Sequence, residues 1–296
     1  MENLYNIADI RGYEIIEKIN KGYSGDEKYK LYRDGKYFLL RIGGIGRFPE
    51  IQMEYKGLER YADSGIRINM PVLLGTAGDR FYSVVTWVGG TSVMDIIKGD
   101  VSGDHYELGR KVGGELRRLH SFGGNASGTG WSEVLEKQAD KVLSGFHKMN
   151  IGFKGAEFAE EYILKNLCLA DGRPQAVLHG DFHWENCVVD GEGNVGIIDF
   201  SGSEAGDPWY DLTGVLWAAE YSGSFARGEI EGYFGDIPGD LWGVFKLYSA
   251  LYMFEHFTFS DGSAPDISRR IKNGERMAGI WGEEFERDIP LFMENF

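Results

Sequence analysis

Cysteine is nearly absent from this chain. Only two of the 296 residues are cysteines, Cys168 and Cys187. Two are too few for a disulfide framework, and no cluster of cysteine and histidine has zinc-finger spacing. We therefore expect a reducing, cytoplasmic setting.

Long apolar runs and an excess of basic residues are also missing. No stretch approaches the roughly 18 apolar residues of a transmembrane helix. Residues 1–10 lack the basic start and apolar centre of a secretory signal. The formal net charge is −15, from 31 basic and 46 acidic residues, and the basic clusters are short. We therefore expect neither nucleic acid nor a membrane as a partner.

Glycine, in contrast, is abundant. The chain has 43 glycines, roughly twice the usual share. They follow no period, which excludes collagen and repeat architectures. Several lie in segments with helical spacing, such as Gly113, Gly114 and Gly243, where each should cost about 1 kcal/mol relative to alanine. The sequence alone offers no functional reason for this excess.

The first part of the chain has the pattern of strands with one inserted helix. Asp34-Gly35 between two β-like runs is a strong hairpin signal. We expect a helix over residues 49–63, where apolar residues recur at helical spacing, and a turn over 75–80. The predicted strands are residues 13–19, 28–32, 37–42, 71–74 and 81–88.

The rest of the chain changes to helical patterns around one β-rich segment, residues 176–200. The change falls at Val88-Gly89-Gly90. We therefore predict an α+β protein with a small antiparallel-sheet lobe, residues 1–88, and a larger helical lobe, residues 89–296. The helices of the second lobe are expected near residues 106–120, 131–149, 157–169, 208–221, 239–259 and 267–285.

The strongest chemical signal lies in the β-rich segment. His179-Gly180-Asp181 is followed by Asn186, then by a hairpin with Asp190-Gly191 at its turn, and then by Asp199. Antiparallel pairing brings the two ends of a hairpin together, so Asn186 and Asp199 should lie close to one another. Two hard oxygen ligands suit Mg²⁺, which usually keeps waters and substrate phosphates as its other ligands.

Asp181 lies five residues before Asn186 on the same loop. It can reach the space beside the metal, where a substrate hydroxyl must be oriented during phosphoryl transfer. His179 is expected to hold the loop by side-chain hydrogen bonds. An alternative is a zinc hydrolase that uses His179, Asp181 and His183 as ligands, but it leaves Asn186 and Asp199 unexplained.

Together these motifs resemble the aminoglycoside phosphotransferase and choline kinase family, which has a bilobal protein-kinase-like fold. The likeness is tightest over residues 176–215, with His-Gly-Asp-x4-Asn and, thirteen residues after the Asn, the Asp of Ile-Asp-Phe. It implies that Asp181 is the catalytic base or the residue that orients the hydroxyl, that Asn186 and Asp199 hold Mg²⁺, and that ATP or GTP is the phosphoryl donor.

The resemblance also implies a nucleotide site in the first lobe. Arg41 stands on the third strand, where the family usually has a lysine that contacts the phosphates, and Glu54 on the next helix would pair with it. Lys28 on the neighbouring strand is a candidate for a second phosphate contact. The loop Asn20–Asp26, which contains Ser24, would cover the phosphates. It has only Gly-x-x-Gly, which is equally compatible with an ordinary hairpin turn.

The sequence therefore predicts a Mg²⁺-dependent kinase that transfers the γ-phosphoryl group of ATP or GTP to a hydroxyl of a soluble small molecule. Acidic residues in the helical lobe, namely Glu204, Glu220 and Glu255, favour an aminoglycoside-like or other cationic acceptor. The alternative is a non-catalytic nucleotide-binding module of the same fold, which the replacement of lysine by Arg41 keeps open.

Overall fold

The structure is a computed structural model, and it describes residues 7–20, 25–99, 103–124, 130–200 and 205–294. Contacts divide the chain into two compact units. The first is Met1–Gly90 with Val188–Ser203, and the second is Thr91–Cys187 with Glu204–Phe296. Residues 188–203 thus group with the first unit, although they follow much of the second in sequence. The lobe limits 1–88 and 89–296 remain a prediction.

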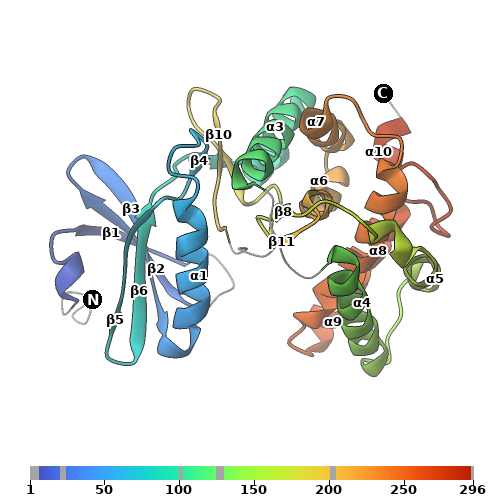
Figure 1. Cartoon of the computed structure of the whole chain (residues 1–296), viewed down its shortest axis with the longest axis horizontal. Helices are drawn as coiled ribbons and strands as arrows, with labels where there is room; N and C mark the ends of the chain where they lie inside the picture. The colour runs from blue at the N-terminus through green and yellow to red at the C-terminus, as the bar shows by residue number, and fades with distance from the viewer. Residues whose placement is uncertain (1–6, 21–24, 100–102, 125–129, 201–204, 295–296) are drawn as a thin grey trace. The chain divides into compact units, whose positions relative to one another are not determined.

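A five-stranded antiparallel sheet forms most of the first unit, in the order β1-β2-β3-β6-β5 (Figure 1). Asp34 and Gly35 join β2 to β3 with φ values of 50° and 78°. Positive φ at both central residues is typical of the type I′ hairpin turn that the sequence predicts. The strands are β1 (Glu14–Ile19), β2 (Glu27–Arg33), β3 (Lys36–Gly44), β5 (Pro71–Ala77) and β6 (Arg80–Thr86).

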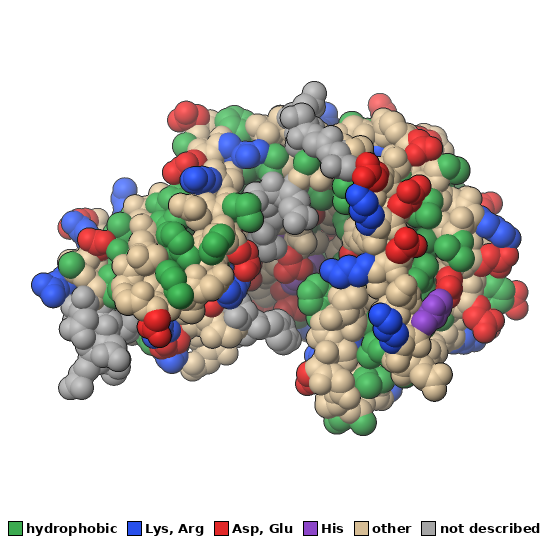
Figure 2. Space-filling view, turned by 60° about the horizontal axis from the view of Figure 1, so that its bottom comes forward, with side chains coloured by type: hydrophobic (Ala, Val, Ile, Leu, Met, Phe, Trp, Pro, Cys, Tyr) green, Lys and Arg blue, Asp and Glu red, His purple; other side chains and the backbone are tan. Residues whose placement is uncertain are grey.

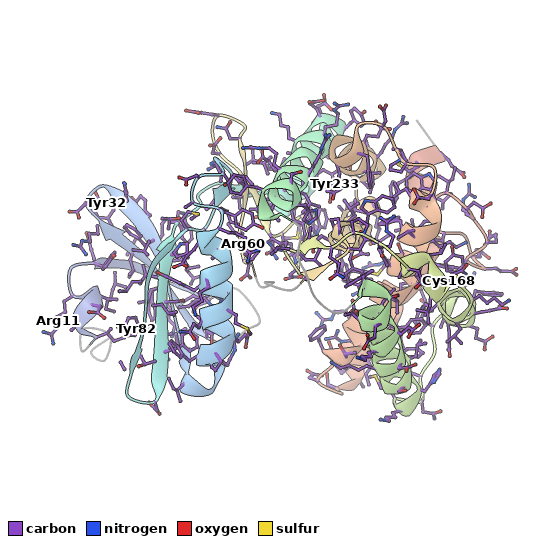
Figure 3. The ribbon with its side chains drawn as sticks, viewed as in Figure 1. Arg11, Tyr32, Arg60, Tyr82, Cys168 and Tyr233 are labelled. Atoms are coloured by element: carbon purple, nitrogen blue, oxygen red, sulfur yellow. The ribbon has the colours of Figure 1, made fainter. Side chains whose placement is uncertain are left out.

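The turn between β5 and β6 is shorter than predicted. β5 continues to Ala77, so the turn is reduced to Gly78 and Asp79. Gly75 lies within the strand opposite Tyr82, which is labelled in Figure 3. A Cβ at Gly75 would overlap the Tyr82 side chain. Glycine at this position therefore makes room for an aromatic ring rather than forming a turn.

Helix α1 (Phe48–Glu59) carries Pro49 in its first turn and packs along β5. Its inner face includes Ile51 and Leu58, each 2% exposed. The core of the sheet includes Leu31, Leu40 and Val84, none of which is exposed. A short parallel pair of β4 (Arg67–Ile68) with β10 (Val195–Ile197) joins the later segment to this unit. Two 3₁₀ helices, η2 (Ala8–Ile10) and η3 (Ile45–Arg47), complete it.

The second unit is mainly helical. Its short strands are β7 (Thr91–Ser92), β8 (Ala176–Val177) and β11 (Ala205–Gly206), while β9 (Cys187–Val189) spans the passage from the second unit to the first. None of its helices, as far as the structure describes them, is long and apolar enough to cross a membrane. The helices are α2 (Val93–Gly99), α3 (His105–Gly123), α4 (Trp131–Lys148), α5 (Ala156–Asn166), η4 (Leu167–Ala170), η5 (Pro208–Gly214), α6 (Val215–Ala219), α7 (Gly223–Phe234), α8 (Leu241–Thr258), α9 (Ala264–Gly279) and α10 (Leu291–Glu294).

Helix α8 lies at the centre of this unit. Apolar residues surround it on all sides, which is the pattern of a buried helix. Phe245, Leu247 and Leu251 have no exposed surface. The helix packs against α4, α5, α9 and η5, so the second core is built around it.

Helices α3 and α7 approach one another unusually closely through glycine. Cβ atoms at Gly109 and Gly113 of α3 would overlap the backbone carbonyl oxygens of Phe225 and Glu229 on α7. Gly228 and Gly232 of α7 face α3 in the same way, and a Cβ at either would overlap an α3 carbonyl oxygen. Part of the glycine excess is thereby explained by helix packing. Helix α7 itself is absent from the sequence-based prediction.

Charged side chains of both signs are spread over the face shown in Figure 2. On the face shown in Figure 2, lysine and arginine side chains lie singly among acidic ones. On that face, the described residues form no continuous basic area of the kind that nucleic-acid-binding proteins present.

Candidate active site

The loop between β8 and β9, residues 178–186, carries the predicted catalytic residue. Near its start, Gly180 has a φ of 83°, which glycine adopts without steric cost. The backbone N–H groups of His179 and Gly180 donate hydrogen bonds to the Asp211 carboxylate at 2.6 and 2.9 Å. A buried carboxylate on η5 therefore fixes the start of the loop.

Asp211 is held in turn by a buried chain of polar groups. His120 Nε2 lies 2.9 Å from Asp211 Oδ2, and His120 Nδ1 lies 2.9 Å from the hydroxyl of Tyr233, which is labelled in Figure 3. Burial acts to raise the pKa of Asp211, but the hydrogen bond and charge of His120, together with His179 and Gly180, outweigh burial and lower the pKa. The loop therefore rests on an ionised carboxylate at neutral pH.

Asp181 and Asn186, five residues apart, meet across the loop. Asn186 Nδ2 donates to the backbone carbonyl oxygen of Asp181 at 2.9 Å and to its Oδ2 at 3.2 Å. The Asp181 side chain is 51% exposed, whereas Asn186 is buried. Since the amide nitrogen of Asn186 faces Asp181, its carbonyl oxygen lies on the opposite side of the amide group and is left to accept from another partner or to bind a cation.

The two histidines beside Asp181 support the loop. His179 is fully buried, and its Nδ1 accepts a hydrogen bond from the backbone N–H of Asp181 at 3.2 Å, which confirms the role predicted for it. His183 Nδ1 accepts from the backbone N–H of Glu185 at 3.2 Å. In the described part of the chain, no three His, Cys, Asp or Glu side chains are grouped to hold a metal ion. The zinc-hydrolase alternative gains no support from this region.

Asp199 belongs to the first unit, directly after β10 and Ile198. Its φ is 58°, in the left-handed region that few non-glycine residues occupy. Its carboxylate lies close enough to Glu54 of α1 to affect the pKa of Glu54. Burial raises the pKa of Glu54, and the charge of Asp199 adds to this, while Arg41 acts in the opposite direction. The first unit therefore brings together Asp199, Glu54 and Arg41.

Arg41 is held between two carboxylates. Its Nη1 lies 2.9 Å from Glu54 Oε1, and its Nη2 lies 3.1 Å from Asp26 Oδ2. Arg47 at the start of α1 also bonds Asp26 Oδ2, at 2.7 Å. The side chain of Asp26 is 3% exposed and that of Arg41 is 11% exposed. The predicted pairing of Arg41 with Glu54 is present, and Asp26 is an additional partner.

Lys28 stands beside this cluster. It lies directly opposite Arg41 in the antiparallel register of β2 and β3, so both side chains emerge on the same face of the sheet. Its ammonium group forms no ion pair with the described residues. Ser24, the remaining residue predicted to contact the nucleotide, lies outside the described residues.

The family model described as "Phosphotransferase enzyme family" matches residues 15–248 of the chain. The chain belongs to this family. The resemblance drawn from the sequence motifs is thereby confirmed, and the match includes every residue predicted for the site. A comparison with curated protein sequences found no match.

Solved structures share the fold of this phosphotransferase. A thermostable mutant of aminoglycoside phosphotransferase APH(4)-Ia is 13% identical, with a TM-score of 0.67 over 93% of this chain and 97% of that one. ADP-bound aminoglycoside phosphotransferase APH(2'')-Ib is 14% identical, with a TM-score of 0.63 over 94% and 99%. Choline kinase LicA from Streptococcus pneumoniae is 16% identical, with a TM-score of 0.62 over 93% and 98%. At these identities the likeness concerns the fold, and it confirms the predicted α+β, protein-kinase-like class.

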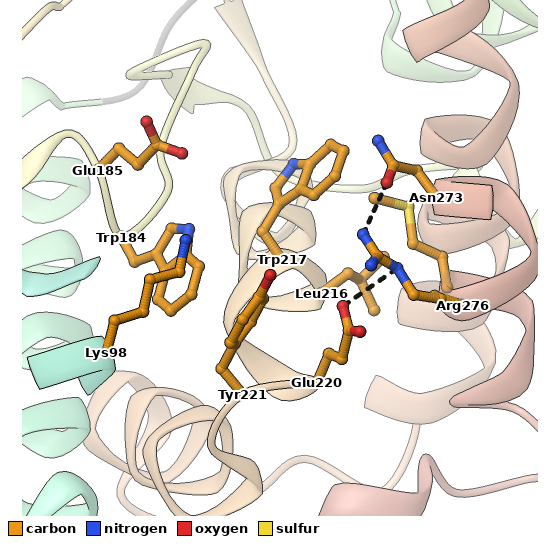
Figure 4. A pocket seen from close by; sticks show the side chains of 10 residues that line it. Lys98, Trp184, Glu185, Leu216, Trp217, Glu220, Tyr221, Asn273 and Arg276 are labelled. Atoms are coloured by element: carbon orange, nitrogen blue, oxygen red, sulfur yellow. Dashed lines mark hydrogen bonds and ion pairs between the residues drawn. The ribbon is translucent and has the colours of Figure 1, made fainter. Parts of the chain in front are cut away.

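A pocket in the second unit of the phosphotransferase lies beside the catalytic loop. Its cavity volume is about 160 Å³, and Trp184 and Glu185 of the loop form part of its wall (Figure 4). Trp217 forms another wall, and its Nε1 donates to the Tyr252 hydroxyl at 2.7 Å. Burial raises the pKa of Tyr252 and the charge of nearby Asp181 adds to it, although the Trp217 hydrogen bond opposes both. Tyr252 therefore connects the pocket to Asp181, because it bonds the pocket residue Trp217 and lies close enough to Asp181 for that charge to affect its pKa.

Sequence reasoning missed Asp26 and this pocket. Asp26 directly follows the Gly22-x-x-Gly25 segment, but nothing in the spacing shows that its carboxylate turns toward Arg41. The walls of the pocket come from four separate segments of chain, so no local motif marks it. The lining residues are Lys98, Trp184, Glu185, Leu216, Trp217, Glu220, Tyr221, Asn273, Arg276 and Met277.

Proposed function

We propose that this phosphotransferase is a Mg²⁺-dependent kinase that transfers the γ-phosphoryl group of ATP or GTP to a hydroxyl of a small molecule. The observation that carries this proposal is the arrangement of Asp181. Its carboxylate is half-exposed beside a pocket, and Asn186 and His179 hold its loop by hydrogen bonds. A positioned carboxylate of this kind can orient a substrate hydroxyl and accept its proton.

Asn186 and Asp199 are the proposed ligands of Mg²⁺. The donor set fits this ion, because the free carbonyl oxygen of Asn186 and the carboxylate of Asp199 are both hard oxygen ligands. When bound, Mg²⁺ would neutralise charge on the phosphates of the nucleotide. The left-handed backbone at Asp199 supports a functional reading, since strained residues cluster at functional sites.

Lys28 is the proposed main cationic contact to the phosphates in the first unit. Arg41 already has two carboxylate partners, Asp26 and Glu54, so much of its charge is compensated. We assign Arg41 the role of organising this cluster, with its fork in reach of a phosphate oxygen. Ser24 remains a proposed contact of the loop that covers the phosphates.

A non-catalytic nucleotide-binding module is the second candidate function. The replacement of the family's usual lysine by Arg41 favours it. The hydrogen-bonded Asp181 argues against it, because a module that only binds nucleotide needs no carboxylate to orient a substrate hydroxyl. The two functions predict the same nucleotide affinity and differ only in phosphoryl transfer.

The acceptor predicted from charge alone was an aminoglycoside-like or other cationic compound. Of the three acidic residues behind this prediction, Glu204 lies outside the described residues. Glu220 is paired with Arg276 at 3.1 Å, and Glu255 accepts hydrogen bonds from Tyr210 and Gln138. Two of the three carboxylates are therefore engaged within the protein, and a cationic acceptor remains a prediction without their support.

Calorimetric titration of ATP and GTP, each with and without Mg²⁺, tests the nucleotide site. We expect binding that depends on Mg²⁺ and that Asp199→Asn weakens by about tenfold or more, since one charged ligand is lost. Asp190→Asn at the tip of the same hairpin is the matched control and should bind like the wild type. Equal affinity with and without Mg²⁺ would remove the metal assignment.

A further inference from the structure

Three of the ten residues that line the pocket beside the catalytic loop are aromatic. Trp184 and Tyr221 lie with ring centroids 5.1 Å apart, and Trp217 faces the same space (Figure 4). Trp184 is 4% exposed and lies in the wall of the pocket, and Tyr221 is 51% exposed. Broad, rigid apolar faces of this kind suit the C–H face of a sugar or another flat ring.

The charged groups of the pocket differ in whether they are compensated. Arg276 is bonded to Glu220 at 3.1 Å and to Asn273 at 2.7 Å, as the dashed lines in Figure 4 mark. The charges of Arg276 and Glu220 therefore largely compensate one another. Lys98 and Glu185 are left, and neither has an oppositely charged partner in the described part of the chain.

Lys98 is the better placed of these two charges. Its Nζ lies 5.2 Å from the ring centroid of Trp184 and 4.8 Å from that of Tyr221, so two cation–π contacts hold it against the aromatic wall (Figure 4). Among the described residues, the side chain of Glu185 has no comparable contact. A fixed ammonium group beside a stacking surface is a recognition element for an anion, and an ammonium of the acceptor would be repelled from it.

We infer that the acceptor is a hydroxylated ring compound of sugar-like shape that carries one anionic substituent, which Lys98 binds while Trp184, Trp217 and Tyr221 contact the ring. This inference rests on the proposed function for the identity of the pocket as the acceptor site. An anionic acceptor has the opposite charge to the cationic acceptor that the sequence predicts. A chain with a net charge of −15 would otherwise attract cations in general.

Three ring compounds that differ in one substituent provide the test: glucuronate, glucose and glucosamine. Binding is measured without nucleotide by ligand-observed NMR and by the fluorescence of the pocket tryptophans. We expect the wild type to bind glucuronate about tenfold more tightly than glucosamine, with glucose between them. Lys98→Met should abolish this preference. Lys137→Met removes another exposed lysine, which lies on α4 and pairs with Glu133, and should leave the preference intact.

Equal binding of the three compounds, a preference for glucosamine, or no binding of any of them would overturn the inference. A preference for glucuronate that survives Lys98→Met would overturn it as well. Because this assay needs no phosphoryl transfer, it separates the two claims. Anion-selective binding without transfer from ATP or GTP would contradict the proposed kinase while leaving the selectivity of the pocket standing.

Discussion

The carboxylate of Asp211 accepts a hydrogen bond from the backbone N–H of His179 at 2.6 Å. Asp211 stands on η5 and His179 opens the catalytic loop, so two segments 32 residues apart are joined by a charge-assisted bond. The same carboxylate reaches Gly180 and His120. The position of Asp181 therefore depends on a buried carboxylate on another element.

Replacing Asp211 by asparagine tests this support. The amide would present a donor to backbone N–H groups that need an acceptor, and we expect a loss of about 2–4 kcal/mol in the free energy of unfolding, together with a lower kcat. Urea denaturation and steady-state kinetics at pH 7 measure the two effects. A variant with wild-type stability and kcat would show that the loop holds its position without Asp211.

The wild type and Asp211→Asn should also differ in how the free energy of unfolding depends on pH. The pKa of Asp211 is lowered in the folded protein, so its carboxylate stabilises the fold fully above the unfolded pKa of about 4 and loses this effect as pH falls through the folded value. The stability difference between wild type and Asp211→Asn should stay constant from pH 7 to pH 5 and shrink at lower pH. A difference that grows on acidification would contradict the assignment.

The glycine contacts between α3 and α7 make a prediction with an internal control. A Cβ at Gly113 would overlap the carbonyl oxygen of Glu229, whereas a Cβ at Gly114, the next residue, meets nothing within 4 Å. Gly113→Ala should destabilise the protein by about 2 kcal/mol or more, because α7 must move away. Gly114→Ala should stabilise it by about 0.5–1 kcal/mol through helix propensity. Thermal unfolding of the two variants decides the point, and equal melting temperatures would refute it.

Glu229 lies in the same helix interface and has an unusual carboxyl group. Its side chain is 2% exposed, and Oε1 has no hydrogen-bond partner among the residues that the structure describes. Burial raises the pKa of Glu229 to about 8. The folded protein therefore keeps a proton that the unfolded chain loses at a pH of about 4.5, and stability should fall as pH rises from about 4.5 to 8.

Glu229→Gln removes this titration while preserving the shape of the side chain. Relative to wild type, the variant should gain stability as pH rises from 5 to 9, by on the order of 2–4 kcal/mol. Urea denaturation at pH 5, 7 and 9 measures the change. Parallel pH profiles for the two proteins would mean that Glu229 titrates normally.

Much of the first unit could be predicted from sequence because its signals are local. The Asp34-Gly35 turn and the alternation of β2 and β3 define a hairpin without help from the rest of the chain. The end of β5 was misplaced because Gly75 was interpreted as part of a turn. Its reason for being glycine is the Tyr82 ring across the strand, which is a tertiary contact.

Helix α7 was missed for a similar reason. Gly223, Gly228, Gly232 and Gly235 interrupt its helical pattern, and propensity alone argues against a helix there. The packing of Gly228 and Gly232 against the α3 backbone decides the structure instead. Sequence patterns report the preferences of single segments, whereas close helix packing depends on two segments at once.

The candidate site likewise contains residues that a local motif predicts and residues that only folding brings together. The loop residues Asp181, Asn186 and His179 could be found from one short motif because their chemistry depends on neighbouring positions. The second partner of Arg41, Asp26, could not, since fifteen residues and a strand pairing separate them. Lys98 and Trp217 are brought to one pocket by folding alone, so their joint role appears only in the structure.

The most direct test of the central claim is phosphoryl transfer by the wild type and by Asp181→Asn. Radiolabelled ATP and GTP are offered with Mg²⁺ and a panel of anionic, neutral and cationic hydroxyl compounds, and nucleotide affinity is measured in parallel. We predict transfer by the wild type, and a fall in kcat of about 10²–10⁴-fold in Asp181→Asn with little change in nucleotide affinity. Transfer by Asp181→Asn within about tenfold of the wild-type rate would contradict the role of Asp181, and nucleotide binding without transfer to any compound would favour the non-catalytic module.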